Sequence, residues 1–424
     1  MRKVFWRNRV LALGATAVAP EPSARTAARG CDDLPRSAEV VVIGGGVVGT
    51  AVAHRLAEKG IDVCLVEKGD IGSGTSSAAA VAALLQTKTS PPKVALALES
   101  LRLLDQMAEQ FGPQFEYTRS GSLLVATSDE ELRMVRSTAT TLMSLGVDVE
   151  LIGAAEARAL MPALGPATIG ASYSRRDATI NPLSLVAAYA QAARRAGATL
   201  CTHTSVTGIS TARGRILSVE TTRGSVKTDT VVNAAGVWAR ELAEMAHVDL
   251  PIEPLKGELL VTEAIPPLVR GTIISAAYLI SKTQLEHPDT GNGSQRSAGI
   301  TVAQVARGNL IIGSTREPAG YDRSSTYGGI LDLAEQLLRL APSLAKLHII
   351  RAYAGLRPIT PDGLPIIGRS PGLAGLIVAS GLGGDGLALS AVTAKLVTEI
   401  VAGADDDMLA VVSPERFVRS GVAP

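Results

Sequence analysis

Three glycines near the start of the chain, Gly44, Gly46 and Gly49, have the spacing G-x-G-x-x-G, and the acid Glu67 follows 18 residues after the last of them. An apolar run precedes the glycines and a helical pattern follows, so the motif stands at a predicted strand-to-helix turn. Such glycines allow a tight turn, a close approach of the backbone to a pyrophosphate, and close helix packing. The acid would accept hydrogen bonds from a ribose. The segment therefore predicts a dinucleotide site, without choosing between NAD and FAD.

Three later segments favour FAD, because they offer small or polar groups to a larger ligand. Residues 68–77 are rich in glycine and hydroxyl side chains, and the predicted strand in 229–239 ends in Ala-Ala-Gly. Residues 381–386 form a second glycine loop before a helix, whose N-terminus would present N–H groups and partial positive charge to an anion. Taken singly, these segments also fit a solvated loop, an ordinary strand-to-helix turn and a hinge.

Strand-like and helix-like segments alternate along the chain, which predicts an α/β fold with a parallel sheet. The helix at 183–197 follows Asn181-Pro182, a typical helix start. Predicted strands cover residues 38–43, 62–67, 205–211, 216–222, 226–233, 253–262, 309–314 and 376–379. Predicted helices cover residues 49–59, 92–111, 183–197, 330–340 and 390–401.

The composition argues against several classes of function. The 424 residues include 41 Lys+Arg and 40 Asp+Glu, and a net charge of +1 gives no reason to expect nucleic acid or an anionic membrane as a partner. No transmembrane segment is predicted. The five histidines show no ligand spacing, so no metal site is predicted. Cys31, Cys64 and Cys201 are odd in number and far apart, which argues against a disulfide framework and a Cys-rich metal cluster.

Residues 1–37 combine basic residues with a short apolar run, as a secretory signal does. Gly14 and Thr16 interrupt that run, so we interpret the segment as a flexible N-terminal extension. We expect a cytoplasmic protein. There are two alternatives to this location. The N-terminal segment could be a cleaved secretory signal, or the protein could associate with a membrane through its electron acceptor.

Five ordered motifs resemble the D-amino acid oxidase / glycine oxidase family of FAD-dependent oxidoreductases: VVVIGGGVVG with Glu67, SGTSSAAA, VVNAAGVWA, GLRPITPDGLPIIG and GLGGDGLALS. The resemblance extends over residues 38–402. It implies a Rossmann-like FAD-binding domain built from discontinuous segments, with an inserted antiparallel-sheet substrate domain. The implied FAD-binding segments are 38–84, 171–250 and 351–424, and the implied substrate-binding segments are 85–170 and 251–350.

Within this family, residues 96–112, 177–182 and 311–323 are most similar to the β subunits of heteromeric opine, hydroxyproline or proline dehydrogenases. This similarity implies α and γ subunits as partners. It also implies a small amino-acid-like substrate.

The reaction that the resemblance implies removes two electrons from a C–N bond. A hydride leaves the carbon next to nitrogen for the flavin N5, and water hydrolyses the resulting imine. Arg357 matches the family's carboxylate-binding arginine, and a planar guanidinium binds a carboxylate through two parallel hydrogen bonds. A surface salt bridge is its alternative role. Tyr278 and Tyr353 are the other candidate catalytic residues, each hydrogen-bonding the substrate or simply packing.

The chain departs from the family in three ways. No cysteine lies in a motif expected for flavin attachment, which implies non-covalent FAD. Asp385 stands where many relatives have histidine, either near the flavin or turned away as a helix cap. Ile311 and Ile312 occupy the strand that carries an oxygen-activating lysine in some oxidases, which favours an acceptor other than oxygen.

The candidate cofactor-binding residues come from all of these segments. They are Gly44, Gly46, Val47, Val48, Gly49, Glu67, Lys68, Ser73, Gly74, Thr75, Ser76, Val206, Ala234, Ala235, Gly236, Trp238, Gly355, Arg357, Gly383, Gly384, Asp385, Gly386 and Leu387.

Three other functions remain open on the residues alone. The chain could be an FAD-binding subunit that needs partner subunits for activity. It could be a flavin dehydrogenase of a hydroxy acid or glycerol phosphate, because an arginine also binds those anions. It could be an NAD-dependent dehydrogenase, which would leave residues 381–390 without a role.

Overall fold

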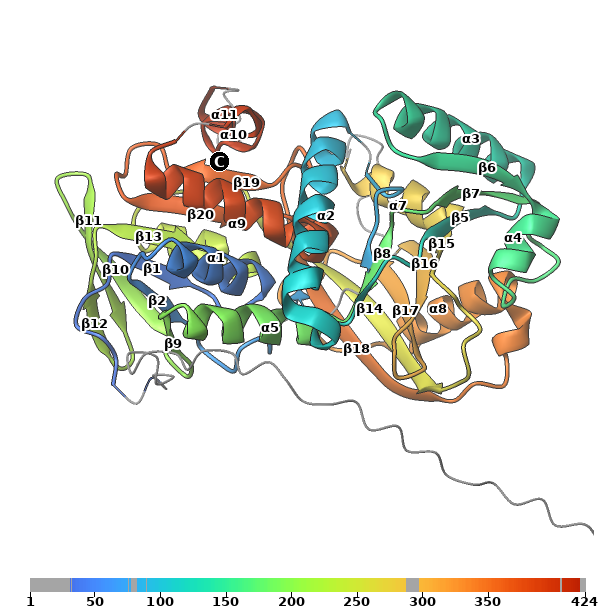
Figure 1. Ribbon diagram of the computed structural model, residues 1–424, viewed down its shortest axis with the longest axis horizontal. Helices are drawn as coiled ribbons and strands as arrows, with labels where there is room; N and C mark the ends of the chain where they lie inside the picture. Colours follow the sequence, from blue (N-terminus) through green and yellow to red (C-terminus); the bar gives the residue numbers. More distant parts are fainter. Residues whose placement is uncertain are drawn as a thin grey trace, which may run out of the picture.

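Two large β-sheets organise the computed structural model (Figure 1). The structure describes residues 31, 33–74, 76–77, 82–88, 90–286, 297–404 and 406–419.

The first large sheet has six strands in the order β19-β20-β13-β1-β2-β9. Its strands are β1 (Val40–Ile43), β2 (Val63–Val66), β9 (Thr199–Cys201), β13 (Thr230–Asn233), β19 (Ile366–Arg369) and β20 (Leu376–Ser380). All neighbours are parallel except β19, which is antiparallel to β20. This sheet, assembled from segments far apart in sequence, confirms the predicted α/β class.

Both faces of the six-stranded sheet are covered, and therefore every residue of β1 is buried. Alternate side chains of a strand point to opposite faces. Val40 and Val42 pack on the helical side, whereas Val41 and Ile43 pack against a small antiparallel sheet. The helices are α1 (Val47–Glu58), α2 (Pro91–Phe111), α5 (Pro182–Arg195) and α9 (Gly386–Ala402), and the small sheet contains β10 (Val206–Ala212), β11 (Arg215–Thr221) and β12 (Gly224–Lys227).

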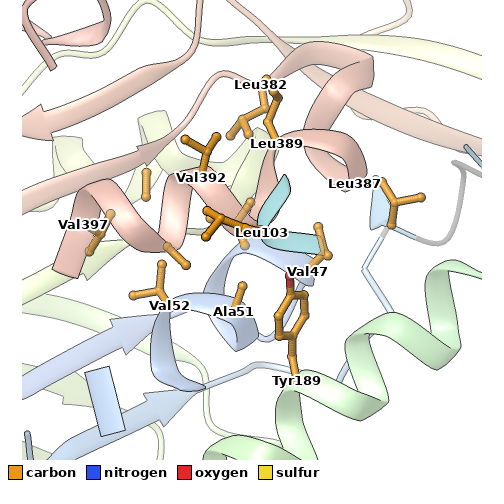
Figure 2. Packing of buried hydrophobic residues seen from close by; sticks show 14 of the residues in the cluster. Val47, Ala51, Val52, Leu103, Tyr189, Leu382, Leu387, Leu389, Val392 and Val397 are labelled. Atoms are coloured by element: carbon orange, nitrogen blue, oxygen red, sulfur yellow. The ribbon is translucent and has the colours of Figure 1, made fainter. Parts of the chain in front are cut away.

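Figure 2 shows the core on the helical side of this sheet, where Val52 of α1, Leu103 of α2, Tyr189 of α5 and Val392 of α9 belong to one buried cluster. Burial of each such side chain contributes about 1.5–3 kcal/mol. The hydroxyl of Tyr189 lies 3.3 Å from Ser390 Oγ, so its polar atom has a partner inside the core. This packing fixes α1 and α9, whose N-terminal turns follow the two glycine loops.

The second large sheet has eight strands in the order β18-β14-β17-β16-β15-β5-β7-β6 and is antiparallel except for the β15–β5 pair. Its strands are β5 (Ser122–Ala126), β6 (Val149–Gly153), β7 (Gly170–Ser174), β14 (Glu253–Ala264), β15 (Thr272–Ser275), β16 (Ser297–Gln304), β17 (Asn309–Arg316) and β18 (Ile349–Ile359). The helices packed on it are α3 (Asp129–Ser144), α4 (Ala154–Leu160), α7 (Ala276–Glu286) and α8 (Tyr327–Leu340).

Shorter elements connect these layers. A three-stranded sheet, β3-β8-β4, contains β3 (Ala82–Ala83), β8 (Ala178–Ile180) and β4 (Tyr117–Thr118). Short helices are α6 (Ala239–Glu244), α10 (Asp407–Val412), α11 (Glu415–Arg419) and the 3-10 helices Gly112–Phe115, Gly236–Trp238, Pro342–Leu344 and Gly383–Asp385.

Several predicted boundaries match the structure, and others differ from it. Asn181 caps α5 by accepting hydrogen bonds from the N–H groups of Leu183 and Ser184, at 3.0 and 3.3 Å. The prediction of one strand over 226–233 is wrong. The chain turns at residues 228–229, and the strands on either side, β12 and β13, belong to different sheets. The helix predicted at 390–401 is α9, which starts at Gly386 because the 3-10 turn before it continues directly into the helix.

One pair of cysteines forms a disulfide, contrary to the expectation from the sequence. Cys31 and Cys201 are bonded, with an S–S distance of 2.07 Å, although 170 residues separate them in sequence. Sequence spacing carries no information on their distance in the fold, where Cys201 ends β9. Cys64 is free and buried in β2, and burial raises the pKa of its thiol to about 12.

None of the helices within the described ranges is both long and apolar enough to cross a membrane. The same described residues contain no cluster of three or more His, Cys, Asp or Glu side chains that could hold a metal ion.

Candidate active site

A cavity of about 420 Å³ lies between the two large sheets. Its walls include the carboxyl ends of β1, β2, β13 and β20 on one side and residues of β14, β17 and β18 on the other. Ligands of open parallel sheets bind outside the carboxyl ends of the strands. The volume lies in the range of about 300–1,000 Å³ that is usual for cofactor sites.

The structure brings most of the predicted residues to this one cavity. The predicted residues that line it are Gly44, Gly46, Val47, Val48, Glu67, Lys68, Ser73, Gly74, Ser76, Val206, Ala234, Ala235, Gly236, Trp238, Tyr278, Gly355, Arg357, Gly383, Gly384, Asp385, Gly386 and Leu387. Gly49 and Tyr353 do not line it. Thr75 lies outside the described residues.

The first glycine loop is close-packed on one side and open on the other. Gly44 has φ +113°, a conformation that favours glycine. A Cβ on Gly49 would lie 1.9 Å from the Gly44 carbonyl oxygen, so only glycine lets α1 begin so close to the turn. A Cβ on Gly46 would meet only Ser77 Oγ, at 3.1 Å, because this residue faces the cavity.

Glu67 is held beside this loop by two backbone donors. Its Oε2 accepts a hydrogen bond from the Gly45 N–H at 2.6 Å, and its Oε1 accepts one from the Gly69 N–H at 2.8 Å. The neighbouring Lys68 places its Nζ 3.3 Å from the centre of the Trp238 ring, a cation–π contact at the cavity wall. The acid therefore stands where the spacing predicts, at the end of β2 and next to the glycine turn.

The Ala-Ala-Gly turn after β13 and the glycine loop after β20 meet at the same cavity. Ser380 Oγ, at the end of β20, donates to the Gly236 carbonyl oxygen at 2.9 Å. Gly236 and Gly383 both have positive φ, at +59° and +55°. These turns bring backbone close to the cavity where larger residues would be strained.

Arg357 reaches into the site from β18 by crossing the neighbouring strand β14. Its Nη1 donates to the carbonyl oxygens of Lys256 and Thr315, both at 3.3 Å, and its Nη2 donates to Ser314 Oγ. A Cβ on Gly257 would lie 2.2–2.6 Å from the guanidinium atoms, so glycine at this position makes room for the arginine. Burial and the nearby positive charge of Arg316 lower the pKa of Arg357 to about 10.

The two candidate tyrosines lie in different places. Tyr278, on α7, lines the cavity, and the guanidinium carbon of Arg316 lies 4.2 Å from its ring centre. Tyr353 pairs with Leu259 across β18 and β14, and its ring faces Arg351 at 5.2 Å. Of the two, only Tyr278 is placed to touch a ligand in the cavity.

Asp385 is the buried acid of the last glycine loop, and two lysines neutralise it. Lys88 Nζ lies 2.6 Å from its Oδ1, and Lys282 Nζ lies 3.2 Å from its Oδ2. Burial would raise the pKa of Asp385, but the charges of these lysines hold it well below its ordinary range. The carboxylate does not cap α9. It therefore adds no net negative charge to the site.

The sequence motifs do not identify four further residues of the site, Gly257, Lys88, Lys282 and Arg316. Gly257 and the lysines are set by contacts between segments far apart, as in the Lys88–Asp385 pair, whose members lie 297 residues apart. Arg316 did carry a signal, because it is a basic residue at the end of the otherwise apolar strand that begins at 309.

The residues present fit an FAD molecule on two observations. The glycine turns form a backbone cradle at the N-terminus of α1, where a Cβ on Gly46 would project into ligand space. The cavity extends without interruption from Glu67 to Arg357. Among the described cysteines none is free and accessible for covalent attachment.

Comparison with known proteins gives an independent line of evidence. Residues 39–400 match the family model DAO, described as FAD dependent oxidoreductase. The chain is 33% identical to a glycine oxidase of Geobacillus kaustophilus over 373 residues, which is 86% of this chain and 92% of that protein. It is 29% identical over 410 residues to the hydrogen cyanide synthase subunit HcnC of Pseudomonas aeruginosa, covering 87% of this chain and 93% of HcnC. The crystal structure of L-proline dehydrogenase from P. horikoshii superposes with a TM-score of 0.81 at 30% identity, covering 91% of this chain and 99% of that one.

Proposed function

The chain belongs to the DAO family of FAD dependent oxidoreductases, and on this premise we propose that it oxidises the C–N bond of a small amino acid or N-substituted amino acid. Candidate substrates are glycine, D-amino acids, hydroxyproline and opines. The glycine oxidase and proline dehydrogenase relatives are both named for amino-acid substrates, which supports this class.

The observation that carries the proposal is the position of Arg357. Its guanidinium lies at the cavity wall, and within the described part of the chain it is hydrogen-bonded only to carbonyl and hydroxyl oxygens. A guanidinium bound in this way keeps its full charge for a carboxylate. The apolar side chains of Leu259 and Ile311 line the same cavity and exclude water from the reacting carbon.

The roles of the other residues follow from their places. Gly44, Gly46 and Gly49 would shape the cradle for the pyrophosphate, and Glu67 would hold the ribose. FAD, when bound, supplies the acceptor for the hydride that leaves the carbon next to nitrogen. Arg357 orients the substrate through its carboxylate, and Tyr278 lies beside it at the wall. The imine product is then hydrolysed by water.

We also propose the division of the chain that the sequence implies. Residues 38–84, 171–250 and 351–424 would bind FAD, and residues 85–170 and 251–350 would bind substrate. The six-stranded sheet lies wholly within the first set, which supports the division. Strand β18 belongs to the eight-stranded sheet and carries Arg357 to the boundary between the two.

A second candidate function is that of one subunit in a larger dehydrogenase. HcnC, which this chain matches over most of its length, is named as a subunit of hydrogen cyanide synthase. On that ground we propose α and γ subunits as partners that receive the electrons. The purified chain alone would then reoxidise slowly in air.

We also propose a cellular location for the protein. The Cys31–Cys201 disulfide favours an oxidising compartment over the expected cytoplasm, because disulfides are rare in the cytosol. Thiol trapping in fractionated cells separates the two, since a cytoplasmic pool would carry free thiols at both positions.

Anaerobic reduction of the bound flavin tests the function. The purified chain is mixed with a panel of glycine, D-amino acids, hydroxyproline, opines, hydroxy acids and glycerol phosphate, and flavin absorbance is followed. Bleaching by an amine that bears a carboxylate supports the proposal. Bleaching by hydroxy acids alone contradicts the proposed substrate class. A colourless protein that uses NAD would show that FAD is not its cofactor. Adding oxygen or a quinone then identifies the acceptor.

A further inference from the structure

Arg316 stands next to Arg357 across strand β14. Strands β17 and β18 pair with opposite edges of β14. Arg357 Nη1 donates to the carbonyl oxygen of Thr315, so its guanidinium reaches the backbone immediately before Arg316. The two arginines are therefore neighbours, and of the two Arg357 lines the main active-site cavity.

Arg316 is buried, with 3% of its surface exposed. Its Nη1 donates to Ser281 Oγ at 2.5 Å, and its guanidinium lies over the Tyr278 ring. Within the described part of the chain, neither Arg316 nor Arg357 forms an ion pair with a carboxylate. Burial of a charge is unfavourable unless the charge is paired, which makes both groups strong receptors for anions.

A second cavity, of about 50 Å³, lies between these groups. Arg316, Arg357, Lys93, Lys282 and Tyr278 are in its wall. It adjoins the main cavity, because Arg357 and Tyr278 line both. A water molecule needs about 10–15 Å³ of such space, so the second cavity has room for a carboxylate.

The acid in this wall, Asp385, is already engaged. Its two oxygens are bound by Lys88 and Lys282, at 2.6 and 3.2 Å. It therefore leaves the two arginines without a partner carboxylate. Burial would raise the pKa of the Tyr278 hydroxyl, but the positive charges around it, led by that of Arg316, hold the pKa below its ordinary value.

We propose that the substrate carries a second anionic group and that Arg316 binds it while Arg357 binds the first. This inference rests on the proposed oxidation of an amino acid and narrows its substrate class. The chemistry that fits is an amine with two carboxylates, such as an N-carboxyalkyl amino acid. Sites that present two guanidinium groups select such a ligand over a monocarboxylate.

Matched substrates test this class directly. Iminodiacetate and N-methylglycine share the secondary amine and differ in one carboxylate. We expect kcat/KM for iminodiacetate to exceed that for N-methylglycine by at least about 30-fold, the scale of a buried charge pair, and Arg316→Met to remove most of this preference. Arg175→Met is the control, because Arg175 also faces a tyrosine ring, Tyr173, but is exposed and follows β7, near the opposite edge of the eight-stranded sheet from β14 and β17.

Inert analogues give a readout that does not depend on turnover. Glutarate and butyrate replace the nitrogen of the two substrates by carbon, and their binding to the FAD-loaded protein is followed by the flavin absorbance shift. We expect glutarate to bind at least about 30-fold more tightly than butyrate to the wild type, with the difference lost in Arg316→Met. If Arg316→Met does not retain FAD, the wild-type comparison decides alone.

The outcomes separate the two proposals. If no amine reduces the flavin but glutarate still outcompetes butyrate, the anion site stands and the proposed reaction fails. Reduction by N-methylglycine and iminodiacetate with equal kcat/KM, or equal affinity for glutarate and butyrate, overturns the second anion site.

Discussion

The guanidinium of Arg357 lies directly over Gly257 of the neighbouring strand, and a Cβ at Gly257 would come within 2.2 Å of its Nη2 atom. Strand register places Gly257 opposite Gly355, two residues before Arg357. The arginine therefore depends on a missing side chain in another segment for its path into the cavity.

Gly257→Ala should displace the guanidinium while leaving the rest of the fold in place. The new Cβ would lie only 2.2 Å from Arg357 Nη2, so one group must move, and the flexible end of Arg357 is the part able to do so. We expect KM for a carboxylate-bearing amine to rise at least about tenfold, with FAD content unchanged, because a misplaced binding group costs on the order of 10²-fold in rate. Gly153→Ala is the control, since a Cβ there meets nothing within 4 Å. Unchanged steady-state kinetics in Gly257→Ala would show that Arg357 is not the anchor.

Two substitutions in the first glycine loop should separate cofactor binding from folding. Gly46→Val places its side chain in the cavity where the pyrophosphate would lie, so the protein should contain no FAD. It should still fold, with a stability loss of about 1 kcal/mol, because valine is unfavourable at the N-cap of α1. Gly49→Ala clashes with the Gly44 carbonyl and should lower the free energy of unfolding by about 1–3 kcal/mol even without cofactor. Flavin absorbance and urea unfolding measure the two effects. A Gly46→Val protein with stoichiometric FAD would contradict the assigned cradle.

Asp385→Asn should destabilise the protein in a pH-dependent way. Removing this carboxylate takes away the negative charge that pairs with the buried ammonium groups of Lys88 and Lys282. We expect this to lower the free energy of unfolding by about 3–5 kcal/mol. The lysines depress the pKa of Asp385 in the folded state, so its contribution is complete above the unfolded value of about 3.9 and is lost as pH falls below it.

Unfolding of wild type and Asp385→Asn in urea between pH 3.5 and 8 measures this effect. The difference in unfolding free energy should be constant from pH 5 to 8 and shrink toward pH 3.5. Asp362→Asn is the control, since its partly exposed pair with Arg416 should contribute no more than about 1 kcal/mol. If the difference in unfolding free energy instead grows as pH falls, the pKa of Asp385 is raised in the folded protein and not depressed.

The Cys31–Cys201 disulfide should stabilise the protein by about 2–4 kcal/mol, because it closes a long loop in the unfolded chain. Cys31→Ser should lower the free energy of unfolding by this amount. Reductant should have the same effect on the wild type and none on the variant. A wild type whose urea midpoint is insensitive to reductant would argue that the two thiols are not bonded in solution.

The parts of the molecule that the sequence predicts well are those whose signals are local. The glycine turn, Glu67 and α5 with its Asn181 cap each depend on residues within one short stretch. The strands predicted at 205–211 and 216–222 likewise match β10 and β11, which are joined by a turn where Arg213 and Gly214 both adopt positive φ. Such features follow from backbone geometry and capping, whatever surrounds them.

The features that escaped prediction arise from contacts between distant segments. Lys282 approaches Asp385 across 103 residues, and Cys31 approaches Cys201 across 170. Gly257 looks like any strand glycine until the register with β18 is known. Tyr353 is a candidate site residue from the sequence, yet its ring lies against Arg351 instead of the cavity. Charge pairing and cross-strand register are tertiary properties that no local pattern encodes.

Anaerobic titration of the FAD-loaded protein with a carboxylate-bearing amine, in the wild type and in Arg357→Lys, tests whether Arg357 anchors the substrate for flavin reduction. Lysine keeps the charge but cannot form the paired hydrogen bonds of a guanidinium. We expect the wild-type flavin to be bleached, and Arg357→Lys, with the same FAD content, to need at least about 30-fold more substrate for half-maximal bleaching. A wild-type flavin that stays oxidised with every such amine, or titrations of the two proteins that superimpose, would contradict this expectation.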